Sequence, residues 1–190
     1  MKSELVRKGI HILIALAPWL AAQNFSHTVL FLMGGVFFFF CVESLRFVGF
    51  SPPFVSSVTA SVLREKEKGH FALGPITLGL GALLSLILFP PWAAAAAIYT
   101  LAFGDCAATI AGRFFGRIRP AFLKGKSIEG PLACFAVTTM VCFFVFRDWR
   151  IAIVTGIVSM LVEAFSIRDL DNLFLPLAAG LTATLAAFLL

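Results

Sequence analysis

Residues 103–130 read FGDCAATIAGRFFGRIRPAFLKGKSIEG, and the interpretation of the rest of the chain depends on this stretch. It begins inside an apolar run and ends in a loop rich in lysine and arginine. If the run spans a lipid bilayer, Asp105 lies at or just inside the membrane boundary. A carboxylate costs about 2.5–3.5 kcal/mol at the centre of a membrane helix. We therefore expect Asp105 to face protein, water, a cation or a metal ion.

Four small residues recur every four positions in this stretch and share one face of the predicted helix. They are Gly104, Ala108, Gly112 and Gly116. Small side chains let a second helix or a ligand approach closely, and both readings stay open at this point. Asp105, Thr109 and Arg113 follow the neighbouring face. A carboxylate able to hold a divalent metal, beside cations able to hold phosphates, is suited to phosphoryl transfer.

The composition indicates an all-α, polytopic membrane protein that forms one domain over residues 1–190. Hydrophobic residues make up 60% of the chain and charged residues 13%, and the mean hydropathy is +0.98. Soluble domains average about 45–50% apolar and about 25% charged residues. The four cysteines lie in or beside apolar runs without CxxC spacing, which favours buried thiols over disulfides or zinc.

Long uncharged runs predict a bundle of about seven transmembrane helices. The expected spans are 8–22, 27–42, 71–89, 92–112, 131–146, 151–165 and 173–190. Residues 43–70 are expected to form a cytosolic loop with an interfacial helix, in which Arg64 and Glu67 can pair. Residues 113–130 are expected to form a basic cytosolic loop that binds nucleotide.

The distribution of charge predicts a cytosolic N-terminus. Of the fifteen lysines and arginines, only Arg147 and Arg150 would lie outside, as the positive-inside rule requires. Of the ten acids, only Asp148 would lie outside, although acids contribute little to orientation. We interpret the one-sided acids as a polar site at the cytosolic face of an integral membrane protein, in the inner membrane if the source is bacterial. The net charge of +5 is then explained by the topology of the chain. It is not a sign of nucleic-acid binding, and no nucleic-acid partner is expected.

The chain resembles the CTP-dependent lipid kinases, which include dolichol, phytol and farnesol kinases and the CTP-using diacylglycerol kinases. Residues 103–116 and 126–130 are similar to the GD-x-x-A…G-R-x-x-G and K-S-x-E-G-S signatures of that family, with Pro131 in place of the final serine. Residues 4–11 are similar to its opening E-L-x-R-K-x-x-H. Glu163 and residues 171–177 are similar to its closing E…D-N-L-x-x-P-L. A weaker similarity links the chain to phosphatidate cytidylyltransferases, which also use CTP.

The resemblance and the residues together predict the site. We expect Asp105, Glu163 and Asp171 to bind Mg²⁺, and Asp105, Glu163 and Lys126 to act in catalysis. Nucleotide binding is assigned to Arg7, Lys8, Arg113, Arg117, Lys126, Ser127, Glu129 and Asn172. Structural alternatives remain for several of them. Ser127 and Glu129 can cap a helix, Asp171 and Asn172 can form an N-cap pair, and Arg7 and Lys8 can serve topology alone.

The predicted reaction is phosphorylation of a membrane lipid alcohol by CTP, which gives a lipid phosphate and CDP. The alcohol is an isoprenoid such as phytol, farnesol or a polyprenol, or it is diacylglycerol. The alternative is a phosphatidate cytidylyltransferase that makes CDP-diacylglycerol. A small transporter or membrane scaffold is disfavoured, because transporters place polar or broken helices near mid-bilayer. Partners are the bilayer, the lipid and CTP, and a homo-oligomer is left open.

Overall fold

Helices follow one another along the chain, and the described residues contain no strand. A computed structural model describes residues 2–50, 70–123, 125–166 and 170–190. The α-helices are α1 (Lys2–Leu13), α2 (Ala17–Gln23), α3 (Phe25–Phe47), α5 (Gly74–Leu88), α6 (Pro91–Tyr99), α7 (Asp105–Phe114), α8 (Glu129–Phe146), α9 (Trp149–Phe165) and α10 (Asp171–Leu189). The turn η1 (Ile14–Leu16) joins α1 to α2, the π-helical turn η3 (Thr100–Gly104) joins α6 to α7, and η4 (Ala121–Leu123) lies in the loop before α8.

Four helical segments are long and apolar enough to cross a membrane. They are Phe25–Phe47, Pro91–Phe114, Glu129–Phe146 and Asp171–Leu189, and Gly74–Leu88 is a shorter apolar helix. These segments support an integral membrane protein and confirm the all-α class. Five of the seven predicted spans coincide with one helix each, whereas span 8–22 is divided among α1, η1 and α2 and span 92–112 among α6, η3 and α7. The count of seven crossings and their orientation stay predictions.

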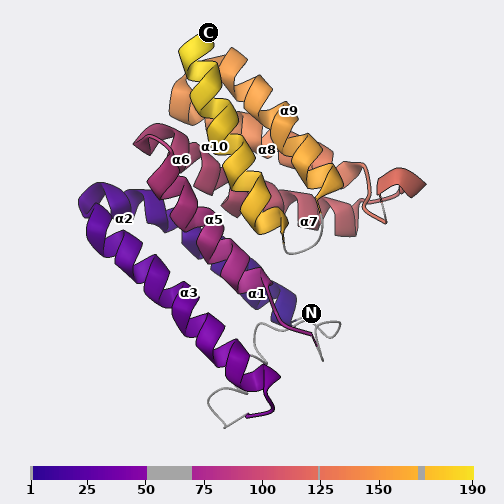
Figure 1. The fold of residues 1–190 in the computed structure, drawn as a ribbon. Helices are drawn as coiled ribbons and strands as arrows, with labels where there is room; N and C mark the ends of the chain where they lie inside the picture. The colour runs from indigo at the N-terminus through magenta and orange to yellow at the C-terminus, as the bar shows by residue number, and fades with distance from the viewer. Residues whose placement is uncertain (1, 51–69, 124, 167–169) are drawn as a thin grey trace.

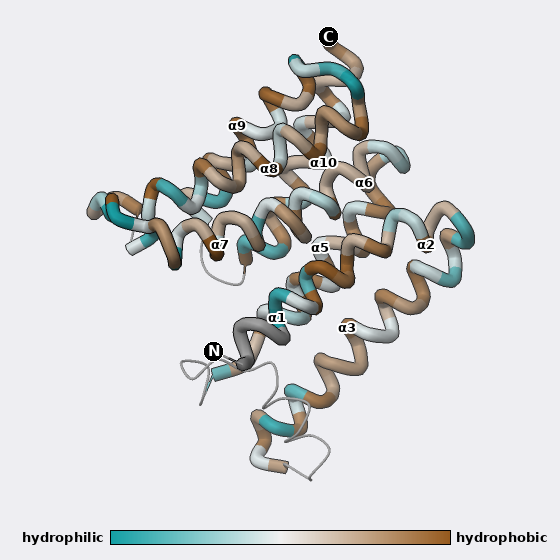
Figure 2. Tube along the Cα trace, turned by 180° about the vertical axis from the view of Figure 1, so that it is seen from behind, coloured by the Kyte–Doolittle hydropathy of each residue, from teal (hydrophilic) through white to brown (hydrophobic). Residues whose placement is uncertain are grey.

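The middle of the bundle is built on the alanine-rich helix α6. Ala93, Ala94, Ala96 and Ala97 are almost fully buried, so neighbouring helices approach its backbone closely. Figure 1 shows α6 between α8, α9 and α10 on one side and α2, α3 and α5 on the other. The residues of Phe37–Phe40 behave differently, since Phe37, Phe38 and Phe40 are exposed on α3. Figure 2 shows apolar residues along the lengths of the helices and polar residues chiefly at their ends and turns.

Helix α3 is longer than the sequence predicted. It continues to Phe47, so residues 43–47, assigned to the loop 43–70, are helical. The reason is that the Glu43 carboxylate, which is fully buried, has hydrogen-bond partners within the protein. It accepts hydrogen bonds from Arg46 Nε at 2.7 Å and from the backbone N–H of Ala72 at 2.6 Å. The rest of the predicted loop, with the expected interfacial helix and the Arg64–Glu67 pair, lies outside the described residues apart from residues 48–50 and 70.

The turn between α8 and α9 contains the two cations and the acid predicted to lie outside. Arg147 ends α8 in the left-handed conformation, with φ of 57°. Asp148 caps α9 by accepting a hydrogen bond from the backbone N–H of Arg150 at 2.8 Å. Hydrogen bonds from the Arg150 side chain and backbone hold the pKa of the Asp148 carboxyl below its usual range. The charged groups of Asp148 and Arg150 therefore pair with each other within this turn.

Candidate functional site

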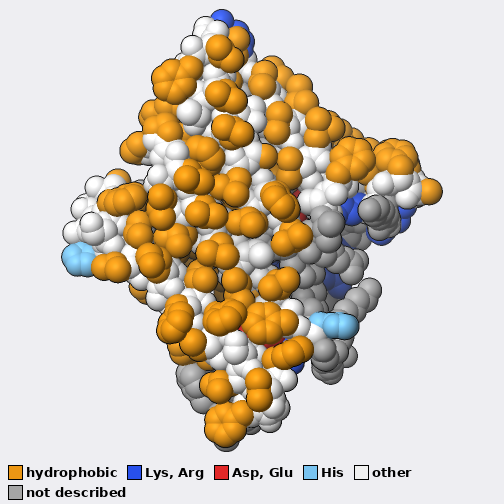
Figure 3. Space-filling model, viewed as in Figure 1, with side chains coloured by type: hydrophobic (Ala, Val, Ile, Leu, Met, Phe, Trp, Pro, Cys, Tyr) orange, Lys and Arg blue, Asp and Glu red, His pale blue; other side chains and the backbone are white. Residues whose placement is uncertain are grey.

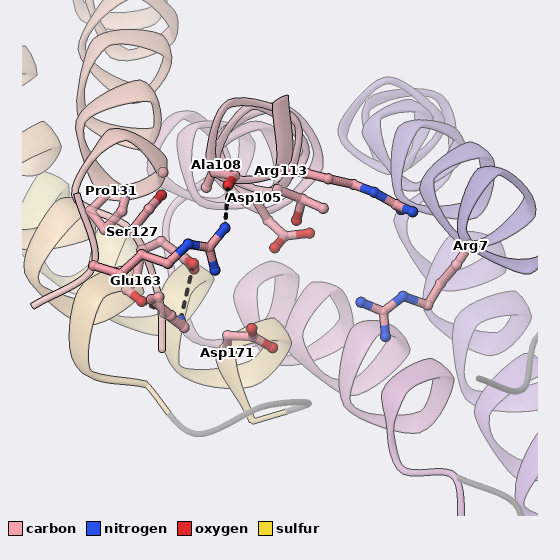
Figure 4. A pocket seen from close by; sticks show the side chains of 13 residues that line it. Arg7, Asp105, Ala108, Arg113, Ser127, Pro131, Glu163 and Asp171 are labelled. Carbon is pink, nitrogen blue, oxygen red and sulfur yellow. Dashed lines mark hydrogen bonds and ion pairs between the residues drawn. The ribbon is translucent and has the colours of Figure 1, made fainter. Parts of the chain in front are cut away.

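A cavity of about 310 Å³ lies where α1, α7, α8, α9 and α10 meet, and Figure 4 shows its walls. The start of α7 follows the π-helical turn η3, which shifts the helical phase immediately before Asp105. Such turns are frequent at functional sites. The lining residues are Arg7, Asp105, Ala108, Thr109, Gly112, Arg113, Arg119, Lys126, Ser127, Gly130, Pro131, Glu163 and Asp171.

Three acids from three helices meet in this cavity. Asp105 begins α7, Glu163 lies in the last turn of α9, and Asp171 begins α10. One carboxylate oxygen from each lies within 4.8 Å of the others, and Asp105 and Glu163 are buried. Three carboxylates this close repel one another unless a cation lies among them. The structure thus brings together the three residues that the sequence predicted as metal ligands.

The donor set fits a hard divalent cation such as Mg²⁺. Carboxylate oxygens are the ligands that Mg²⁺ and Mn²⁺ prefer. Glu163 Oε2 is buried and has no hydrogen-bond partner among the described residues. Buried polar atoms normally have a partner, so this carboxylate oxygen, on an acid that lies beside two others, fits the role of a metal ligand. Asp105, Glu163 and Asp171 are the residues that would hold it.

Two lysines contact the same acids. Lys8 Nζ donates to Asp105 Oδ2 at 2.5 Å, and His11 Nδ1 lies 3.0 Å from that oxygen. Lys126 Nζ donates to Glu163 Oε1 at 3.1 Å, to the Glu163 carbonyl, and to Ser166 Oγ at 3.2 Å. The acids are therefore partly neutralised by ammonium groups, each of which comes from a segment far away in the sequence.

Arginines line the other walls of the cavity. Figure 4 shows Arg7 from α1 and Arg113 from α7 on the side away from Glu163. Arg119 also lines the cavity and donates to the carbonyls of Gly125 at 3.0 Å and Gly112 at 3.3 Å. Acids beside fixed guanidinium groups form a site that can hold a metal ion together with an anionic polyphosphate.

The face of small residues is a packing surface. A Cβ on Gly104 would lie 2.9 Å from Thr138 Oγ1 of α8, and a Cβ on Gly130 would lie 3.1 Å from the Ala108 carbonyl. A Cβ on Gly112 would lie 3.2 Å from Ser127 Oγ. The structure thus supports helix packing, and because Ala108 and Gly112 also line the cavity, close approach of a ligand to this face stays open. The neighbouring face carries Asp105, Thr109 and Arg113 into the cavity, as expected.

Four residues predicted to bind nucleotide do not line the cavity. The first is Lys8, whose ammonium group contacts Asp105 instead. Glu129 Oε1 accepts hydrogen bonds from the backbone N–H groups of Arg117 at 2.8 Å and Ile118 at 3.1 Å. Asn172 is buried, and its Nδ2 donates to the Gly74 carbonyl at 3.2 Å, which fastens α10 to α5. The Arg117 side chain is exposed. The side chains of Glu129 and Asn172 are therefore engaged with other parts of the protein.

Ser127 is different, since it lines the cavity, is buried, and its Oγ has no hydrogen-bond partner among the described residues.

Sequence reasoning did not select Arg119 or His11 for the site. Arg119 is one of five cations in the basic loop, and nothing in their spacing distinguishes it. His11 lies one turn after Arg7 and was part of the similarity over residues 4–11, which was the only available signal.

Comparison with known proteins gives distant relatives over most of the chain. A phytol kinase of Synechocystis sp. is 30% identical over 200 residues, covering 98% of this chain and 81% of that protein. A CTP-dependent diacylglycerol kinase 1 of Schizosaccharomyces pombe is 25% identical over 140 residues, covering 65% of this chain and 64% of that protein. A probable chloroplastic phytol kinase of Triticum aestivum is 27% identical over 209 residues, covering 97% of this chain and 68% of that protein. No family model matches the chain, and no solved structure matches it.

Proposed function

Because the chain belongs to the family of CTP-dependent lipid kinases, we propose that it transfers the γ-phosphoryl group of CTP to the hydroxyl of a membrane lipid alcohol. The products are a lipid phosphate and CDP. The alcohol is an isoprenoid alcohol or diacylglycerol, the two classes that the names of the relatives contain.

The observation that carries this proposal is the convergence of Asp105, Glu163 and Asp171 beneath a set of cations. Phosphoryl transfer needs little covalent help from the protein, and its catalysis rests on positioning and on charge neutralisation. Asp105, Glu163 and Asp171 would hold a divalent metal, which would supply positive charge to offset the charge that develops on the phosphate. The arginines and lysines around the cavity supply the remaining positive charge.

Each group has a defined task in the proposed reaction. Arg7, Arg113, Arg119 and Lys126 bind the triphosphate, and Ser127 Oγ donates to a phosphate oxygen. The lipid oxygen attacks the γ-phosphorus as the bond to the β-phosphate oxygen breaks, and CDP leaves. The hydroxyl proton passes to one of the carboxylates of the cavity.

The proposal places the cavity at the cytosolic face of the membrane. CTP is a cytosolic nucleotide, and the lipid hydroxyl lies at the interface between the acyl chains and water. The residues that line the cavity come from the segments whose basic residues favour the inside.

Labelled CTP tests the reaction. Purified protein in nanodiscs is incubated with Mg²⁺, a panel of phytol, farnesol, undecaprenol, dolichol and diacylglycerol, and CTP labelled at either the γ- or the α-phosphate. We expect γ-label in the lipid and release of CDP. With phosphatidate as the lipid, α-label in the lipid and release of pyrophosphate would instead establish the cytidylyltransferase reaction. No transfer from either label to any lipid would overturn the proposal.

A further inference from the structure

The loop that follows α7 projects beyond the bundle and exposes large hydrophobic side chains. We call residues 114–123 the wing; it lies at the right of Figure 1, beyond α7 and α9. Phe114, Phe115, Ile118 and Phe122 are 75%, 68%, 60% and 66% exposed. Exposed apolar groups gathered in this way mark contact with a membrane or a partner.

The wing is amphipathic. Arg117 and Arg119 alternate with its apolar residues, and Arg113 lies just before it. At the right edge of Figure 3, hydrophobic side chains gather on the upper side of the projection, where they continue the hydrophobic flank along α9. Lysine and arginine side chains gather on its lower side. Apolar groups on one side and arginines on the other are typical of segments that lie in the plane of a membrane interface.

The position of the wing in the chain keeps it beside the bilayer. It begins at Phe114, where one candidate membrane segment ends, and the next such segment begins at Glu129. Glu129 Oε1 accepts hydrogen bonds from the backbone of Arg117 and Ile118, so the wing is tied to the start of α8. It cannot move far from the membrane surface without breaking these bonds.

We propose that the wing lies in the head-group layer of the bilayer, with its phenylalanines among the acyl chains and Arg117 bound to the phosphates of acidic phospholipids. Acidic lipids are the occupant that fits, because they offer apolar chains and negative charge at adjacent depths. Arg117 was predicted to bind nucleotide, but its side chain is exposed and does not line the cavity. On this proposal its partner is the membrane surface.

The depth of the wing in the bilayer tests the proposal that its phenylalanines lie among the acyl chains. Spin labels are placed at Phe122→Cys and, as a matched control at a basic position of the wing, at Arg117→Cys. Both are made in a Cys41→Ser background, because Cys41 is half-exposed whereas the other three cysteines are buried. We expect the label at 122 to collide preferentially with oxygen, and the label at 117 with a water-soluble nickel complex. Equal preference for the nickel complex at both positions would overturn the placement.

The retention of lipids by the purified protein tests the proposal that Arg117 binds acidic phospholipids. The full chain is released from nanodiscs that contain phosphatidylcholine and phosphatidylglycerol, and retained lipids are counted by native mass spectrometry. We expect Arg117→Gln to lower the enrichment of phosphatidylglycerol about fivefold, the factor for roughly 1 kcal/mol per interfacial arginine. Arg150→Gln, in the turn between α8 and α9, should leave it unchanged. If Arg117→Gln instead keeps the enrichment and weakens CTP binding, Arg117 is a nucleotide ligand and the proposal is wrong.

Discussion

At the scale of single residues, Asp105 has the most demanding environment. It is buried, it contacts Lys8 and His11, and it shares a cavity with two other acids. Replacing it with asparagine keeps its shape but removes the charge that holds a cation. We expect Asp105→Asn to lower kcat/KM by on the order of a hundredfold or more, while the protein still folds.

Asp148→Asn is the matched control for this substitution. Asp148 caps α9 in the turn between α8 and α9, and asparagine is an equally good N-cap residue. Activity on a lipid alcohol with CTP and the thermal unfolding temperature are measured for both variants. Wild-type turnover in Asp105→Asn, or an equal loss in Asp148→Asn, would remove Asp105 from the proposed mechanism.

Lys126 supports a less intuitive prediction. Its ammonium group contacts Glu163, where a metal ion would otherwise be bound, so the lysine and the metal compete until a triphosphate provides the lysine with a new partner. We expect Lys126→Gln to weaken CTP binding and, without nucleotide, to raise the affinity for Mn²⁺ on the order of tenfold. Electron paramagnetic resonance of free Mn²⁺ measures that affinity directly.

The charge of Lys126 is separated from its shape by a second variant. Lys126→Arg keeps the positive charge beside Glu163 and should leave the affinity for Mn²⁺ close to that of the wild type. An unchanged or lower affinity in Lys126→Gln would show that the two cations do not share a site.

Charge, position in the chain and the family resemblance were sufficient to group Asp105, Glu163 and Asp171, and the structure brings their carboxylates together. Their roles as metal ligands and in catalysis stay predictions. Glu129 and Asn172 were assigned to the nucleotide because of their segments. Their side chains instead bond to the backbone of residue 117 and to α5, and such tertiary partners leave no mark in local sequence.

At the scale of helices, the lengths of apolar runs were enough to predict where each helix lies. Helix ends were predicted less well, because a charged residue ends a membrane helix only when its charge has no partner. Glu43 has partners in Arg46 and Ala72, so α3 continues past it. The π-helical turn before Asp105 could not be predicted either, since it depends on packing around Thr100 and Gly104.

The contact between α5 and α10 positions one of the three acids. A Cβ on Gly81 would collide with the Asn172 carbonyl and lie 3.1 Å from Pro176 Cγ. We expect Gly81→Val to destabilise the protein by about 1–3 kcal/mol and, by displacing the first turn of α10, to move Asp171 away from the other acids. Activity should therefore fall by more than the loss of folded protein explains.

Gly35 provides the control for the packing argument. It lies within α3, and a Cβ there would meet nothing within 4 Å. Gly35→Val should leave activity and unfolding temperature nearly unchanged. Activity per folded molecule is obtained from turnover and from the folded fraction by size-exclusion chromatography. If Gly81→Val keeps wild-type activity per folded molecule, the α5–α10 contact does not set the geometry of the cavity.

At the scale of the whole molecule, the two ends of the bundle differ in chemistry. The cavity, the wing and the start of α1 lie toward one end, and the turn between α8 and α9 lies toward the other. Figures 1 and 2 both show the N- and C-termini at opposite ends of the bundle. Seven crossings would produce this arrangement, and their number stays a prediction. On the predicted topology, the positive-inside rule would direct the cavity toward the cytosol.

Cysteine labelling in cells tests this topology. The chain is expressed in a bacterial inner membrane in the Cys41→Ser background, with Asp148→Cys or Arg117→Cys as the reporter. A membrane-impermeant maleimide should label position 148 in intact spheroplasts, whereas position 117 should react only in inverted vesicles. The reason is that thirteen further lysines and arginines favour retention of the opposite end inside. Labelling of both positions from the same side would require an even number of crossings between them. Labelling of position 117 in intact spheroplasts would place the cavity on the wrong side for a cytosolic nucleotide.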